Sequence, residues 1–92
     1  MRIEQLEYLV AVTRYGSLRR AGEHLHVSQP ALSEAIGKLE RELCVPLLER
    51  HRTGAQASAD GIELLAPIAD VLESVARLRA AARVRRDRRP SK

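Results

Sequence analysis

Most of this chain carries apolar residues three and four positions apart, in runs that end at helix-terminating residues. This pattern limits the fold more than any other feature, because the spacing is that of one face of an α-helix. The first run, IEQLEYLVAVTRY, starts at Ile3 and stops at Gly16, and a later run breaks at Pro46. Few strand signals appear. We therefore expect a mainly α fold built from helices that each bury one face.

Serine residues mark the starts of three further helices. Ser17 is a good N-cap for SLRRAGEHL, a segment too short to be stable without tertiary contacts. After a brief turn, HVS, Ser28 caps a longer helix with Pro30 in its first turn. Proline costs little there, because the first N–H groups of a helix have no partner within it. Ser58 precedes the fourth helix, for which Pro67 predicts a kink.

The fourth helix is the candidate dimerisation element. It carries a near-heptad apolar stripe, which consists of Ile62, Leu65, Ile68, Leu72 and Val75. The stripe is too long and wide for one small domain to cover, so pairing with a second copy is the favoured interpretation. Packing against the first helix is the alternative.

The positive charge of the chain lies in its C-terminal part. The net charge is +4, and residues 77–92 contain eight basic residues and one acid, a sum of +7 that leaves −3 for residues 1–76. Net charge alone therefore does not make the folded part a nucleic-acid binder. The last stretch, VRRDRRPSK, is a charge run with a proline, and we expect residues 85–92 to be a disordered basic tail.

Several classes of protein are not expected. No run approaches the about 20 apolar residues of a membrane span, and the N-terminus lacks the apolar stretch of a signal peptide, so we expect a cytoplasmic location and no membrane partner. Cys44 is the single cysteine and is predicted to be a small buried residue. His24 and His26 lie too close for a shared helical face, so no metal site is predicted. Without a phosphate loop, a nucleophile elbow or paired carboxylates, neither an enzyme nor a cofactor is expected.

Two helices joined by a short turn, with the second capped and exposed, form the helix-turn-helix arrangement of DNA-binding domains. Ala21 and Gly22 supply the small residues required where the two helices touch. Gln29 suits a bond to adenine, and Ser33 suits any base edge. The alternative is a small helical bundle whose polar side is simply solvated.

The run GSLRRAGEHLHVSQPALSEAIGKLERELCVPLLER resembles the N-terminal winged helix-turn-helix of LysR-type transcriptional regulators, from Leu6 to Gly61. The stretch ASADG stands where that family usually has a Leu-Thr-x-Ala-Gly motif. The resemblance implies a DNA-binding domain of three helices plus a short β-wing at residues 1–58, with a recognition helix at Gln29–Leu43 and a wing at about Leu48–Ala57. A linker helix at residues 59–84, which pairs with its copy, and the basic tail at 85–92 follow.

The resemblance also implies site residues and partners. The partners are double-stranded DNA, with a pseudo-palindromic operator, and a second copy in a homodimer or higher oligomer. The resemblance implies base contacts by Gln29, Pro30 and Ser33, phosphate contacts by Ser28 and Lys38, and a wing arginine in the minor groove. From the exposed faces of the chain we add Glu34 to the base-contacting residues, and Ser17, Arg19, Arg50 and Arg52 to the phosphate and wing contacts.

This chain departs from the family pattern at several positions. Glu34 stands where the family often has arginine; it would either accept a bond from cytosine N4 or pair with Lys38. Gly is usual where Cys44 stands, and Thr53 occupies a slot where the wing often has arginine. Members also continue into a small-molecule effector domain, none of which is in this sequence. The alternative function is a dimerisation module that titrates related regulators without binding DNA.

Overall fold

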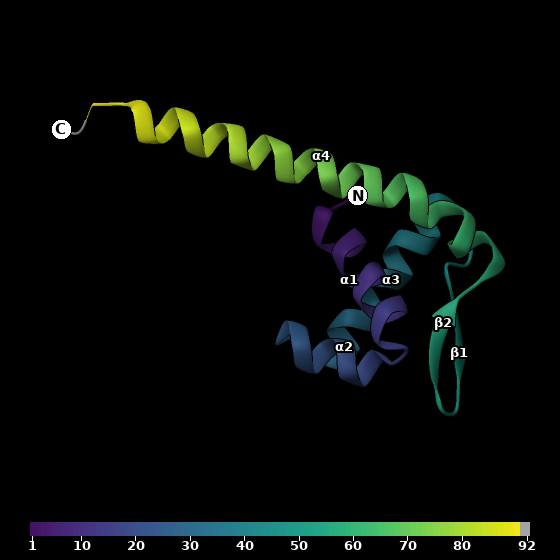
Figure 1. Ribbon diagram of the computed structural model, residues 1–92. Helices are drawn as coiled ribbons and strands as arrows, with labels where there is room; N and C mark the ends of the chain where they lie inside the picture. Colours follow the sequence, from purple (N-terminus) through teal and green to yellow (C-terminus); the bar gives the residue numbers. More distant parts are fainter. Residues whose placement is uncertain (91–92) are drawn as a thin grey trace.

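The computed structural model describes residues 1–90, and Ser91 and Lys92 lie outside the described part. Its elements are α1 (Ile3–Tyr15), α2 (Leu18–Leu25), α3 (Gln29–Leu43), β1 (Leu48–His51), β2 (Gly54–Ala57) and α4 (Ala59–Arg88). Helices α1 to α3 form a small body, the β1–β2 hairpin stands beside it, and α4 crosses the body and projects beyond it (Figure 1). The predicted mainly α fold with a short wing and a long last helix is confirmed.

Serine caps start three of the four helices, as the sequence predicts. The side chain of Ser17 accepts a hydrogen bond from the backbone N–H of Arg20 at 3.2 Å, and that of Ser28 accepts one from Ala31 at 3.2 Å. Ser58 is buried, and its hydroxyl makes two hydrogen bonds. Its hydroxyl accepts from the N–H of Gly61 at 2.9 Å and donates to the carbonyl of Pro46 at 2.6 Å. The start of α4 is therefore fastened to the segment that precedes the hairpin.

Left-handed residues end the first three helices. Gly16 has a φ of 68°, His26 a φ of 58° and Cys44 a φ of 62°. A side chain with a Cβ is strained in this region, so Cys44 occupies a position that favours glycine. Cys44 is exposed, and the prediction that it is buried is wrong. A small apolar residue type suggests burial, but a residue that terminates a surface helix turns outward.

The core joins α1, α3 and the segment before β1. Its fully buried side chains are Leu6, Leu9, Val12, Leu32, Ile36, Leu39 and Leu47. Helix α2 approaches this core through Ala21, which is fully buried, and through Gly22. A Cβ at Gly22 would lie 2.7 Å from the carbonyl oxygen of Val27, closer than real Cβ contacts. Glycine is therefore required on the face of α2 that meets the turn between α2 and α3.

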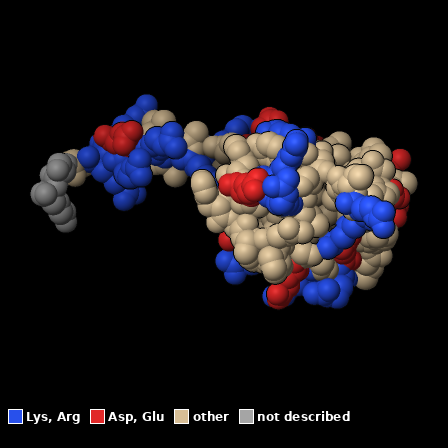
Figure 2. Space-filling model, turned by 90° about the horizontal axis from the view of Figure 1, so that it is seen from below, with Lys and Arg blue, Asp and Glu red and all other residues tan. Residues whose placement is uncertain are grey.

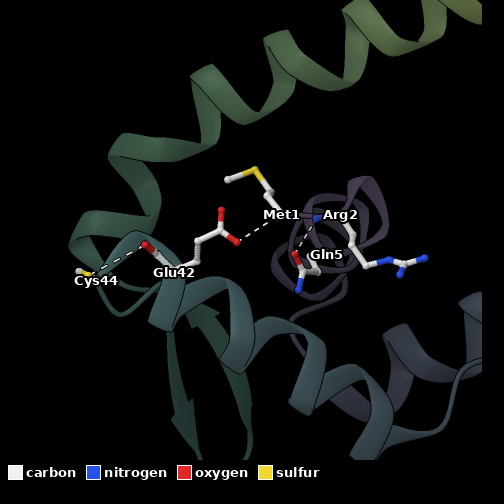
Figure 3. A network of polar contacts seen from close by, with 5 residues as sticks. All are labelled: Met1, Arg2, Gln5, Glu42 and Cys44. Atoms are coloured by element: carbon white, nitrogen blue, oxygen red, sulfur yellow. Dashed lines mark hydrogen bonds and ion pairs between the residues drawn. The ribbon is translucent and has the colours of Figure 1, made fainter.

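The N-terminus is held against the far end of α3. The Met1 amine lies 3.0 Å from Glu42 Oε1, and the backbone N–H of Arg2 donates to Gln5 Oε1 at 2.8 Å (Figure 3). The Arg2–Gln5 bond closes the first turn of α1 itself. The Met1–Glu42 ion pair is exposed, so it adds only a weak link between that turn and α3, and the core holds the two helices together.

The hairpin is antiparallel, with Leu48 opposite Ala57 and His51 opposite Gly54. Its two ends are attached differently to the body. Near the tip, the N–H of Ala55 donates to the carbonyl of Gly16 at 3.0 Å. A side chain at Gly54 would collide with that same carbonyl. The hairpin is thus fixed to the turn between α1 and α2.

A carboxylate of α3 attaches the other end of the hairpin. One oxygen of Glu40, Oε2, accepts from the backbone N–H of Leu47 at 2.7 Å and from that of Leu48 at 3.2 Å. Both leucines are buried, so these N–H groups have little access to water. Glu40 therefore sets the position of β1 relative to the recognition-helix candidate α3.

Helix α4 is continuous through Pro67, which is exposed. The predicted stripe on this helix does not act as one surface. Ile68 is only 6% exposed and belongs to the core of its own protomer, and Leu64 and Leu72 pack against that core. Ile68 therefore has little surface left for a dimer interface, and this part of the helix packs on the body, as in the alternative interpretation. Periodicity showed that a stripe exists but not which neighbour covers it.

The end of α4 also differs from expectation. The helix extends past residue 84 to Arg88, so residues 85–88 are helical rather than disordered. Alanine and arginine are both strong helix formers, which explains the extension through an alanine-rich and arginine-rich segment. The expectation of a disordered tail also covers Ser91 and Lys92, which lie outside the described residues. Within the described part, no helix combines the length and apolar character needed to cross a membrane.

Candidate nucleic-acid interface

The first turn of α3 is the most exposed part of that helix. Ser28, Gln29 and Pro30 are all exposed, and the Ser28 cap fixes the direction in which the turn projects. Pro30 replaces one of the N–H groups that would lack a partner at a helix start. The sequence prediction of a capped α3 with proline in its first turn, over Gln29–Leu43, is confirmed.

A polar groove runs beside this turn. It is formed by the connection from α1 to α2, by the start of α3 and by the tip of the hairpin, and it is lined by Tyr15 to Arg20, Gln29 and Arg50 to Gly54. The groove brings together five of the predicted site residues, namely Ser17, Arg19, Gln29, Arg50 and Arg52. Figure 2 shows the molecule from the side of α2 and the hairpin tip, where basic and acidic side chains form small groups on a largely uncharged surface.

Ser33 and Arg50 are in direct contact. Ser33 lies one turn after Gln29 on α3 and is half-buried, and Arg50 is an exposed residue of β1. The guanidinium Nη1 of Arg50 donates a hydrogen bond to Ser33 Oγ. The hairpin and α3 are thus linked by side chains that the sequence assigns to two separate roles.

Glu34 and Lys38 lie on the other side of α3. The ammonium of Lys38 is 3.5 Å from Glu34 Oε1, and both side chains are exposed. They border a shallow depression between α3 and α1, whose lining includes Arg2, Gln5 and Tyr8. The pairing predicted for Glu34 is present in the structure. An exposed pair of this kind contributes only about 0.3–0.5 kcal/mol, so it opens readily.

A second predicted cation also has an acidic partner, and some residues beside the predicted site were not expected from the sequence. Arg19 pairs with Glu23 at 3.3 Å. Arg20 and His51 line the groove but were not predicted as site residues. The signal for Arg20 was its position beside Arg19 at the start of a short exposed helix. Arg2 lies far from the recognition helix in sequence, and its place beside Glu34 follows only from the packing of α1 on α3.

Comparisons with known proteins agree with this geometry. Residues 3–62 match the model of the family described as bacterial regulatory helix-turn-helix protein, lysR family. The chain is 45% identical over 75 residues to the hydrogen peroxide-inducible genes activator of Pectobacterium carotovorum subsp. carotovorum, covering 82% of this chain and 25% of that protein. It is 40% identical over 87 residues to the HTH-type transcriptional regulator TcbR of Pseudomonas sp. (strain P51), covering 90% of this chain and 30% of that one.

Solved structures give the same result. The DNA-binding domain of CbnR in complex with DNA has a TM-score of 0.83 and 36% identity, covering 97% of this chain and 100% of that one. Full-length OxyR C199D from Pseudomonas aeruginosa has a TM-score of 0.85 and 34% identity, covering 91% of this chain and 28% of that one. The chain spans about a quarter of the length of the curated relatives that it matches.

Proposed function

This chain belongs to the LysR family of bacterial regulatory helix-turn-helix proteins, as its motif predicts, and on that premise we propose that it binds a specific DNA site as a homodimer. The chain is a DNA-binding domain of a transcriptional regulator and not an enzyme.

The observation that carries the proposal is the exposed, capped first turn of α3 beside a groove lined by arginines. A major groove about 12 Å wide admits an α-helix with its N-terminus leading. In that pose Gln29, Pro30 and Ser33 face base edges. Gln29 bonds to an adenine, and Pro30 contributes an apolar contact. Glu34 lies at the edge of this face and reads a cytosine amino group only if its pair with Lys38 opens.

The phosphate contacts come from residues around that turn. Ser17 and Ser28 stand at the starts of α2 and α3, where backbone N–H groups favour an anion. Arg19 and Arg52 line the groove, and Lys38 lies on the opposite flank of α3. Arg50 also lines the groove, but it bonds to Ser33 and contacts a phosphate only if that bond opens. The cations thus bracket the recognition turn, as a clamp on the two sugar–phosphate strands of one groove requires.

The projecting half of α4 supports a homodimer. Val71 and Leu78 are 43% and 69% exposed, and with Asp70, Ser74 and Val75 they line an apolar hollow on the side of α4. Burying such side chains contributes about 1.5–3 kcal/mol each. Of the predicted apolar stripe, Val75 belongs to this proposed interface, and Leu72 packs partly against the core of its own protomer. Ile62 and Leu65 remain candidates for contacts with the second copy.

Charge along α4 indicates how two copies pair. Residues 59–76 carry four acids and no basic residue, whereas residues 77–89 carry seven arginines and one acid. Basic side chains dominate the projecting end of the helix in Figure 2. Antiparallel pairing sets the arginine-rich end of one copy against the acidic half of the other, and parallel pairing would set arginine against arginine. An antiparallel pair has two-fold symmetry, which presents two α3 helices to a pseudo-palindromic site.

Gel-shift titration with a DNA fragment selected from a random pool tests the DNA-binding proposal. Affinity is expected to fall with salt by a slope of about −0.9 per phosphate contacted, and Gln29→Ala is expected to lower the preference for the selected site over random DNA. Gln56→Ala, on the exposed side of the hairpin, is the control and should change neither. Binding that is indifferent to both salt and sequence would refute the proposal.

Light scattering tests the dimer. Leu78→Asp combined with Val71→Asp should give a monomer, because each aspartate would be buried without a partner. Ala80→Asp is the matched control, since residue 80 is exposed on the opposite side of the same part of α4. A double variant with the mass of the unmodified chain would rule out this interface. A stable dimer that never engages DNA would instead favour the titration function.

A further inference from the structure

The bond between Arg50 and Ser33 determines what Ser33 can offer to a ligand. A serine hydroxyl has one hydrogen to donate and two lone pairs to accept with, whereas a guanidinium only donates. Arg50 therefore occupies a lone pair of Ser33 Oγ. Among residues 1–90, the Ser33 hydroxyl donates to no other protein group, so its hydrogen is free to bond to a ligand.

The positive charge of Arg50 strengthens this bias. A hydroxyl that accepts a bond from a cation becomes a better donor, since chains of hydrogen bonds polarise one another. A nearby guanidinium also attracts electron-rich atoms and repels amino groups. The guanidinium of Arg50 is bonded to Ser33, so it is close enough to act on any base that meets the hydroxyl.

We infer that Arg50 fixes Ser33 as a hydrogen-bond donor, and that this chain therefore selects a base with an acceptor at one position of its site. This inference rests on the proposed function. In the major groove guanine offers N7 and O6, adenine N7 and thymine O4, whereas cytosine offers only an amino donor. Cytosine is therefore the base excluded on the strand that Ser33 contacts. Arg50 acts through Ser33 and is a positioning residue for base recognition.

A competing arrangement gives a different result. Arg50 is exposed, so on binding DNA it can leave Ser33 for a phosphate. Ser33 would then rotate freely and accept or donate according to the base it meets, and Arg50 would contribute the same affinity to every sequence. Affinity alone does not distinguish the two arrangements, because Arg50 raises it in both. The effect of Arg50 on the preference for one base over another does.

The experiment uses the unmodified chain and a site selected from random double-stranded DNA. Affinity is measured for all four bases at each position, for the chain and for Ser33→Ala, Arg50→Met and Arg52→Met. The unmodified chain should bind about five-fold more weakly when cytosine replaces the preferred base at one position. Ser33→Ala should abolish that penalty, and Arg50→Met, which keeps the aliphatic stem but no donor, should reduce it to below two-fold. Arg52→Met, on the same hairpin, should weaken binding to all sites equally and leave the penalty intact.

The outcomes are distinct. A cytosine penalty that survives in Arg50→Met overturns the inference. It is also overturned if replacing the preferred base lowers affinity by the same factor in the unmodified chain and in all three variants. Replacing the preferred purine by its 7-deaza analogue should mimic Ser33→Ala if N7 is the acceptor. If the unmodified chain binds no selected DNA, the proposed function is refuted, and this inference with it. If the chain binds but the cytosine penalty is the same with and without Arg50, only the inference is refuted.

Discussion

Glu40 offers the sharpest test of how the hairpin is held beside α3. Its Oε2 accepts bonds from two consecutive backbone N–H groups, at 2.7 Å from Leu47 and 3.2 Å from Leu48. Glu40→Ala removes the one oxygen that accepts both bonds and leaves two N–H groups of buried residues unpaired. Glu40→Gln keeps an amide oxygen in the same place but removes the charge.

The expected loss follows from those two bonds. A hydrogen bond to a charged group contributes about 1.5–3 kcal/mol, and the half-buried carboxylate places the pair at the low end of the range. Glu40→Ala should therefore lower the free energy of unfolding by about 3 kcal/mol, and Glu40→Gln by about 1 kcal/mol. For a domain of this size each kcal/mol corresponds to roughly 4–8 °C of melting temperature.

Thermal unfolding followed by far-ultraviolet circular dichroism measures both variants. The chain has no tryptophan, and all samples must share one protein concentration because pairing of copies also raises the melting temperature. Glu42→Ala is the matched control, since the Glu42 side chain is on the same helix, is 47% exposed and, within residues 1–90, pairs only with the terminal amine. If Glu40→Ala and Glu42→Ala melt within about 2 °C of one another, the carboxylate does not hold the hairpin.

Three further changes follow from the geometry. Cys44→Gly should raise the free energy of unfolding by about 1 kcal/mol in the same melt, because it removes a left-handed side chain; an unchanged melting temperature would mean that this helix end is not strained. Gly22→Ala should be destabilising by about 1–2 kcal/mol despite the better helix propensity of alanine, since its Cβ meets the Val27 carbonyl, and a stabilised variant would show that the turn can shift. Glu34→Gln should free Lys38 and steepen the salt slope of DNA binding by about 0.9; relaxed preference at one base position would instead show that Glu34 reads a cytosine.

Local features of the sequence predicted most of the fold. The caps at Ser17, Ser28 and Ser58 place three helix starts correctly, because capping depends on a side chain and the N–H group three residues later. Gly16 and Pro46 marked the ends of helical runs for similarly local reasons. These interactions span a few residues, so they can be read without knowing the tertiary structure.

Features set by contacts between distant residues were not predicted. The apolar stripe of α4 indicated an interface, but whether Ile68 faces its own body or another copy depends on where α1 lies. The exposure of Cys44 depends on the turn it terminates, and the bond of Arg50 to Ser33 spans 17 positions. The candidate site residues were therefore named from residue type and resemblance, while their pairing came from the structure.

The division of α4 into a packed half and a projecting half has a consequence for amide hydrogen exchange. Amides near Gly61 and Ile68 lie against the body, so they exchange only when the body itself opens. From residue 79 to residue 88 the helix is surrounded by solvent in a lone protomer, so its amides exchange whenever the helix frays from its end. Amides in the two halves of α4 thus exchange at two different rates. A partner that covers the projecting half slows exchange in that half only. The difference between the two rates is therefore a residue-resolved measure of how much of the protein is paired.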